Sequence, residues 1–149
     1  EQAREAAERK LAAERRAALQ REEEEMQRRM QEQAAATEAA RIRAQQAAAL
    51  RAAEVNSIVA RYRDMISTKI RGNTRLPPNL QGNPEVEYSV RLLPTGEIVA
   101  ITLNKGSGIA AYDEAVRRGI ERSSPLPLPT DREAAARFRS LEIRHRAHE

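Results

Sequence analysis

The sequence predicts an α+β protein, in which a long single α-helix forms a stalk and a small domain carries a three-stranded, mainly antiparallel sheet covered by helices. Three observations favour this fold class. Residues 1–71 lack Gly and Pro and consist mostly of strong helix formers. Residues 86–103 alternate as a β-hairpin does, and amphipathic or extended segments flank them. We therefore divide the chain into a helical stalk, residues 1–54, and a C-terminal α+β domain, residues 55–149.

Composition limits the classes of function that the chain can have. With no Cys, no Trp and one Phe in 149 residues, the sequence is too poor in large apolar residues for one large core. The absence of Cys excludes disulfide and thiolate chemistry. Residues 1–54 hold 11 basic and 11 acidic side chains, so the net charge of +4 falls on residues 55–149. No apolar run reaches the roughly 18–20 residues that span a bilayer. Because the first residue is Glu1 and not Met, we expect a fragment of a longer protein.

The stalk reads as a spacer. Opposite charges recur four residues apart at Glu5/Arg9, Glu24/Arg28 and Glu25/Arg29, a spacing that stabilises helices. If all 71 residues are helical, the helix reaches about 105 Å. The large apolar residues keep no heptad register; they are Leu11, Leu19, Met26, Met30, Ile42 and Leu50. A semi-rigid spacer is therefore favoured over a self-assembling coiled coil, and a partly ordered helical tether remains open.

The first helix of the domain begins where this pattern changes. Its apolar stripe has helical spacing and consists of Val55, Ile58, Val59, Tyr62, Met65, Ile66 and Ile70. We expect Gly72, followed by Asn73, to end the helix in a left-handed cap. An irregular loop over residues 74–85 then leads to the hairpin. In the hairpin, Val86, Tyr88, Val90 and Leu92 alternate with polar residues, and the run 98–103 follows Pro94-Thr95-Gly96. That tripeptide suits a type I turn closed by a left-handed Gly.

The remaining elements follow from local signals. Gly106-Ser107-Gly108 reads as a strand-to-helix turn before a helix over 109–122, whose buried stripe is Ile109, Tyr112, Val116 and Ile120. Its expected ion pairs are Asp113/Arg117 and Glu114/Arg118, and Gly119 indicates close approach of another backbone. Residues 123–129 must be extended because of their three prolines. Thr130-Asp131-Arg132-Glu133 reads as a capping box for a short helix through about Arg139. A third strand, Leu141–Arg146, ends the domain.

In order and type, these motifs resemble the TolA/TonB C-terminal family, and within it the periplasmic domains of TolA-like proteins. The resemblance rests on Tyr62, Ile66 and Ile70 after an Ala- and charge-rich helix, on Pro94–Ile98, and above all on 106–116 followed by 124–129. It covers essentially the whole chain. One departure is Thr74, where an aromatic residue is expected, and this departure concerns the packing of the 74–85 loop.

The resemblance implies a role that periodicity does not reveal. TolA-like proteins are anchored in the inner membrane, engage the proton-driven TolQ–TolR motor and span the periplasm of Gram-negative bacteria. Their terminal domain binds TolB, is linked to Pal at the outer membrane, and serves colicins and filamentous phage as a receptor. The Tol–Pal system maintains envelope integrity and constriction at division. The resemblance therefore implies a non-enzymatic protein-binding domain without a cofactor, and a TonB-like energy transducer is the alternative.

Partners of such domains bind by adding a β-strand to an open sheet edge. We expect the docking edge to be the last strand, comprising Leu141, Glu142, Ile143, Arg144, His145 and Arg146. Arg144 and Arg146, with Arg139 nearby, would favour an acidic partner. Guarding the edge against aggregation explains the same charges equally well. On this reading, Ile143→Pro abolishes partner binding and leaves helix content intact.

Signals for other functions are weak. His145 and His148, near Glu142 and Glu149, could suggest a metal site, but a strand does not place residues three apart on one face, so a frayed tail is favoured. Ser107 lacks the context of a nucleophile. A basic nucleic-acid-binding protein is the less favoured alternative, because the excess of positive charge is small and the sequence has no aromatic stacking pairs.

Overall fold

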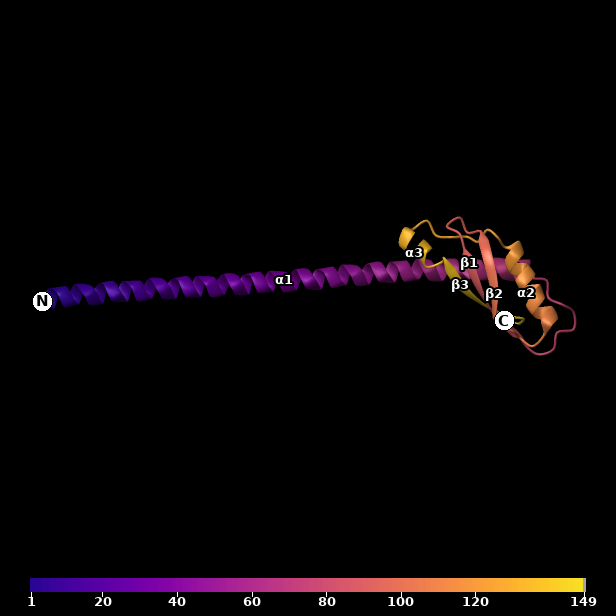
Figure 1. Cartoon of the computed structure of the whole chain (residues 1–149), viewed down its shortest axis with the longest axis horizontal. Helices are drawn as coiled ribbons and strands as arrows, with labels where there is room; N and C mark the ends of the chain where they lie inside the picture. Colours follow the sequence, from indigo (N-terminus) through magenta and orange to yellow (C-terminus); the bar gives the residue numbers. More distant parts are fainter. Residues whose placement is uncertain (149) are drawn as a thin grey trace. The chain divides into compact units, whose positions relative to one another are not determined.

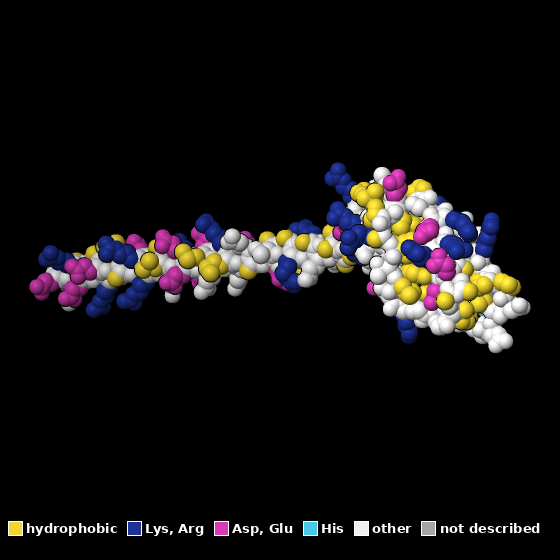
Figure 2. All heavy atoms as spheres, turned by 45° about the vertical axis from the view of Figure 1, so that its right-hand side comes forward, with side chains coloured by type: hydrophobic (Ala, Val, Ile, Leu, Met, Phe, Trp, Pro, Cys, Tyr) yellow, Lys and Arg dark blue, Asp and Glu magenta, His cyan; other side chains and the backbone are white. Residues whose placement is uncertain are grey.

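The computed structural model describes residues 1–148, and the chain divides into two compact units, residues 1–50 and the residues from Arg51 onward. In the first unit, part of helix α1 (Gln2–Asn73), no side chain is buried. Basic and acidic side chains are interspersed along it (Figure 2). Of the three ion pairs expected in residues 1–50, the structure forms Glu25–Arg29, at 2.9 Å.

No helix among residues 1–148 combines the length and the apolar character needed to cross a bilayer.

From Arg51 onward, α1 forms one wall of the domain. Val55, Val59, Ile66 and Ile70 are buried, and Ile58 and Tyr62 are half-buried against the same core. Met65 is 45% exposed, so its assignment to the buried stripe was wrong. It lies at the margin of the stripe, where helical periodicity alone does not decide burial.

The end of α1 also differs from expectation. Gly72 does not have a positive φ, and the helix continues through Asn73. The hydroxyl of Thr74 then donates a 2.7 Å hydrogen bond to the carbonyl of Ile70, which satisfies one of the last helical acceptors. A side-chain cap therefore ends the helix in place of the expected left-handed Gly.

The sheet has the order β2-β1-β3, with both pairs antiparallel (Figure 1). Its strands are β1 (Glu85–Leu92), β2 (Ile98–Lys105) and β3 (Ser140–Arg146). The turn between β1 and β2 contains Gly96 at φ +91, as the turn motif predicts. These observations confirm the α+β class and the three-stranded antiparallel sheet.

One face of the sheet is buried against the helices. The inward side chains of β1 are buried together with α1 and with helix α2 (Ala110–Arg122), which supplies Tyr112, Val116 and Ile120. Tyr88 donates a 2.6 Å hydrogen bond from its hydroxyl to the carbonyl of Asp113, and burial raises the pKa of its phenol. The residues of β1 and β3 that point to the opposite face are polar. The helices and the sheet thus form two layers.

The ion pairs on α2 correct one expectation. Arg118 lies 3.5 Å from Glu114, as expected, but Arg117 pairs with Glu121 at 3.7 Å and not with Asp113. The carboxylate of Asp113 instead accepts hydrogen bonds from the hydroxyl and the backbone N–H of Ser107, at 2.6 and 3.1 Å. Asp113 thereby closes the turn between β2 and α2.

The short helix α3 (Arg132–Ala136) ends before Arg139, three residues earlier than expected. Its N-cap is Asp131 and not Thr130, because the Asp131 carboxylate accepts from the N–H groups of Glu133 and Ala134. Arg51 of α1 binds Asp131 at 2.7 Å and Glu133 at 3.2 Å. The guanidinium lowers the pKa of Asp131, and the two N–H donors lower it further.

Candidate binding edge

Strand β3 lies at an edge of the sheet and pairs only with β1 among the described residues. The six residues expected at the docking edge alternate in burial along it. Leu141, Ile143 and His145 are buried, and Glu142, Arg144 and Arg146 are exposed. His145 belongs to the sheet and bonds the hydroxyl of Tyr112 through Nδ1 at 2.7 Å. The prediction that His145 belongs to the third strand is therefore confirmed, and the competing reading of His145 as part of a frayed tail was wrong. Glu149 of the suggested metal cluster lies outside the described residues.

Two hydrogen bonds just beyond the ends of β3 show which of its residues direct their backbone N–H and C=O groups at β1. Leu92 donates its N–H to the carbonyl of Arg139 at 2.9 Å, and Ala147 donates to Pro84 at 3.1 Å. In an antiparallel pair, the N–H and C=O of one residue point to the same side, and this side alternates along the strand. With the observed register, the odd-numbered residues of β3 therefore direct their backbone groups at β1.

The even-numbered residues of β3 consequently direct their backbone groups away from the sheet. They are Ser140, Glu142, Arg144 and Arg146. Arg71 of α1 donates from Nη1 to the carbonyl of Arg146 at 3.3 Å and so covers one end of the edge. The open part of the edge thus spans Ser140, Glu142 and Arg144, which is enough for one short added strand.

The exposed charges of β3 are compensated within the domain. Arg144 lies 3.0 Å from both Glu85 and Glu87 of β1, and Arg146 lies 2.8 Å from Glu85. These four side chains form a ladder of alternating charge across the polar face of the sheet. Arg144 and Arg146 therefore offer an acidic partner less charge than their sequence pattern indicates.

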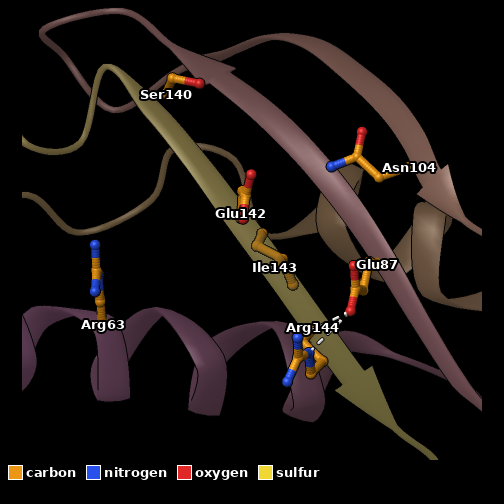
Figure 3. A pocket seen from close by; sticks show the side chains of 7 residues that line it. All are labelled: Arg63, Glu87, Asn104, Ser140, Glu142, Ile143 and Arg144. Atoms are coloured by element: carbon orange, nitrogen blue, oxygen red, sulfur yellow. Dashed lines mark hydrogen bonds and ion pairs between the residues drawn. The ribbon is translucent and has the colours of Figure 1, made fainter.

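A further basic side chain, that of Arg63, lies beside the open edge. A cavity of about 560 Å³ is lined by Arg63, Glu87, Asn104, Ser140, Glu142, Ile143 and Arg144. Figure 3 shows Arg63 extending from α1 toward the side of β3. Among residues 1–148, no carboxylate lies within ion-pairing distance of Arg63. Sequence patterning assigns Arg63 only to the solvent side of α1, because nothing local to the helix indicates which strand passes beside it.

The other edge of the sheet, β2, is partly occupied. The N–H of Ile98 donates to Oγ of Ser124 at 3.2 Å, and Leu126 donates to the carbonyl of Gly96 at 2.8 Å. The register of β2 also shifts at two points, beside Val99 and beside Asn104. Such irregularities blunt an edge against pairing. The β3 edge is therefore the more regular template for an added strand.

These features define a class of protein, a small two-layer α+β domain with an open, regular sheet edge. Residues 59–144 match the family described as TonB C terminal, which covers more than half of the chain. The chain belongs to the TonB C-terminal family.

The fold is shared with a solved structure. It is the NMR structure of TolAIII bound to a peptide derived from the N-terminus of TolB, with 22% sequence identity and a TM-score of 0.50. The match covers 58% of this chain and 72% of that chain. This similarity confirms the expected TolA/TonB C-terminal resemblance at the level of fold. None of the curated proteins matches the chain.

Proposed function

We propose that the domain from Arg51 onward binds an extended segment of a partner protein as a fourth strand on the β3 edge. The observation that carries this proposal is the outward direction of the backbone groups of Ser140, Glu142 and Arg144. Main-chain hydrogen bonds to such groups supply affinity, and the alternating side chains of the added strand supply register. Binding, and not catalysis, is the activity we propose.

The partner we propose is TolB, acting through an N-terminal segment. This choice is supported by the shared fold with TolAIII, whose structure holds a TolB peptide. The uncompensated guanidinium of Arg63 beside the edge favours carboxylates in that segment and would speed encounter more than it deepens affinity. Of the six residues expected at the docking edge, we therefore retain those in its open part, and we add Arg63 of α1 to the proposed binding site.

We further propose the cellular setting that the TolA-like reading implies. The domain acts in the periplasm as part of a longer inner-membrane protein that TolQ and TolR drive, and it links this motor through TolB to Pal. Colicins and filamentous phage coat protein are proposed as secondary ligands. Residues 1–50, in which no side chain is buried, serve as the spacer.

The test is a calorimetric titration of the full chain with a synthetic TolB N-terminal peptide. Glu142→Pro removes an N–H that faces the open edge, and Pro is tolerated where this N–H faces solvent. We expect the variant to keep its sheet and to lose at least ten-fold in affinity. Unchanged affinity for Glu142→Pro would rule out β3 as the docking strand.

Two controls make the test specific. Leu103→Pro removes an outward N–H from the β2 edge, where Leu103 is 51% exposed, and should leave the affinity unchanged. Ile143→Pro is not a clean test, because the N–H of Ile143 faces β1, and its loss breaks the sheet itself. Loss of binding in Leu103→Pro alone would move the docking site to β2.

The family match supports a second candidate function, that of a TonB-like energy transducer for outer-membrane transporters. The same β3 edge would then bind an extended segment of a transporter. A competition titration distinguishes the two functions. It compares the binding of a TolB N-terminal peptide with that of a peptide from the N-terminal segment of a TonB-dependent transporter. Binding of the transporter peptide alone would favour the TonB-like function.

A further inference from the structure

An apolar groove lies between the β1–β2 turn, the extended segment after α2, and α3, and it ends at Arg139, just before β3. Its volume is about 310 Å³, at the lower end of the roughly 300–1,000 Å³ found for ligand pockets. Its lining is mostly apolar and includes Leu93, Leu128, Ala136 and Phe138, together with Arg132 and Arg139. Phe138 and Pro129 are buried in it, and Leu93 remains 41% exposed.

Hydrogen bonds fix all three walls of the groove. Gly96 donates its N–H to the carbonyl of Leu93 at 2.9 Å, and the carbonyl of Gly96 accepts from Leu126 at 2.8 Å. Asp131, which caps α3, is bound by Arg51 at 2.7 Å. The groove is therefore already formed in the absence of a ligand. The binding free energy consequently includes only a small cost for ordering the walls of the groove.

Two arginines line the groove together with its apolar residues. Arg132, at the start of α3, and Arg139, just after it, are both exposed, and neither forms an ion pair within residues 1–148. A guanidinium binds carboxylates in bidentate geometry. The groove thus combines space for one apolar side chain with two cations for neighbouring carboxylates.

We propose that this groove is a second docking site, which binds an apolar side chain flanked by acidic residues in an extended segment of a partner protein. Charge complementarity to Arg132 and Arg139 selects an acidic segment over other apolar ligands. The inference does not depend on the β3 edge, because the groove shares no residue with the open part of that edge.

The experiment is an NMR titration of the ¹⁵N-labelled full chain with three synthetic peptides. The first carries Leu between two Asp residues, the second replaces Asp by Lys, and the third replaces Leu by Ala. The first peptide should shift the amide signals of Leu93, Ala136 and Arg139 and leave those of Glu142 and Arg144 in place. The Lys and Ala peptides should bind at least ten-fold more weakly.

Two variants locate the site. Ala136→Trp fills the groove from an exposed position of α3 and should abolish the shifts at Leu93 and Arg139. Arg132→Glu combined with Arg139→Glu should weaken the Asp peptide at least ten-fold and favour the Lys peptide. Arg118→Glu, an exposed arginine of α2, is the matched control and should change neither affinity.

Three outcomes would overturn the proposal. They are equal or absent binding of the Asp and Lys peptides, shifts confined to β3, and shifts of the groove signals with protein concentration in the absence of peptide. The last outcome would assign the groove to a second copy of the chain. Loss of TolB peptide binding in Glu142→Pro is a separate result, so the failure of either proposal can be distinguished from the failure of the other.

Discussion

Gly96 is the residue at which the hairpin meets the extended segment that follows α2. It has φ +91, and a Cβ built on it would overlap the carbonyl oxygen of Leu126. Gly108 has almost the same conformation, φ +90, but a Cβ there would meet no atom within 4 Å. The two glycines therefore separate the cost of a left-handed conformation from the cost of a steric clash.

We predict that Gly108→Ala lowers the free energy of unfolding by about 1–2 kcal/mol, the cost of a non-Gly residue in this region. Gly96→Ala should cost about 3 kcal/mol or more, because overpacking against a backbone atom adds to it. Urea denaturation of both variants measures this difference. Equal costs for the two substitutions would show that the extended segment moves away freely from the turn.

Asp131 carries a dependence of stability on pH. Its folded-state pKa is lowered, chiefly by Arg51 and then by the N–H of Ala134. A depressed folded pKa means that the carboxylate stabilises the fold above its unfolded pKa of about 3.9. This stabilisation is lost as the pH falls through the folded pKa.

We predict that Arg51→Gln destabilises the domain near neutral pH and that the difference from the unaltered chain shrinks as the pH falls below about 4. Urea titrations across this range, followed by tyrosine fluorescence, provide the measurement. Arg41→Gln is the matched control, because Arg41 binds Glu38 in residues 1–50 and should not affect the domain. A constant difference at all pH values would contradict the role of the Asp131 carboxylate.

At the scale of elements, α2 packs against the residue that ends α1. A Cβ at Gly119 would overlap Oγ1 of Thr74 and lie 3.0 Å from its Cα. This contact confirms the close approach that Gly119 predicts and shows how the 74–85 loop begins without an aromatic residue. Oγ of Ser123, the C-cap residue just after α2, donates to the carbonyl of Gly119 at 2.7 Å.

We predict that Gly119→Ala lowers the free energy of unfolding by up to about 2 kcal/mol. Overpacking costs about 1–3 kcal/mol, and the better helix propensity of Ala offsets about 1 kcal/mol of this cost. In a Thr74→Gly background, where the facing side chain is absent, the same substitution should cost less. A double-mutant cycle with no coupling would show that α2 moves without resistance from the end of α1.

At the scale of the whole molecule, the two units owe their structure to different forces. Residues 1–50 bury no side chain, and Met26 and Leu50 are 65% and 74% exposed. Helicity there rests on propensity and on pairs such as Glu25–Arg29. The domain from Arg51 onward rests on a buried core shared by its helices and sheet.

We predict two distinct thermal transitions. All three tyrosines, Tyr62, Tyr88 and Tyr112, lie in the domain, so near-ultraviolet circular dichroism follows the domain alone. That signal should change in one cooperative step. The far-ultraviolet helical ellipticity should in addition decrease gradually at temperatures below this step, because an isolated helix melts with low cooperativity. Coincident transitions that depend on protein concentration would instead indicate a self-associating stalk.

Much of the fold could be predicted from the sequence because its signals are local. The alternation in β1, the Pro94–Gly96 turn and the helical stripe around Val59 each depend on neighbouring residues alone. The errors at Gly72 and Thr130 are of one kind, because the capping role predicted for each is filled by a nearby residue, Thr74 or Asp131. Met65 differs, because it lies at the margin of the helical stripe, where periodicity alone does not decide burial.

The sequence by itself determined which residues of β3 point into the core and which into solvent, because a strand alternates with period two. Only the tertiary structure decided which backbone groups stay open for a partner. That choice depends on the register of β3 against β1, on Arg71 at Arg146, and on Arg63 beside the edge. These contacts join residues distant in sequence, and distance in space, not order along the chain, sets their interaction.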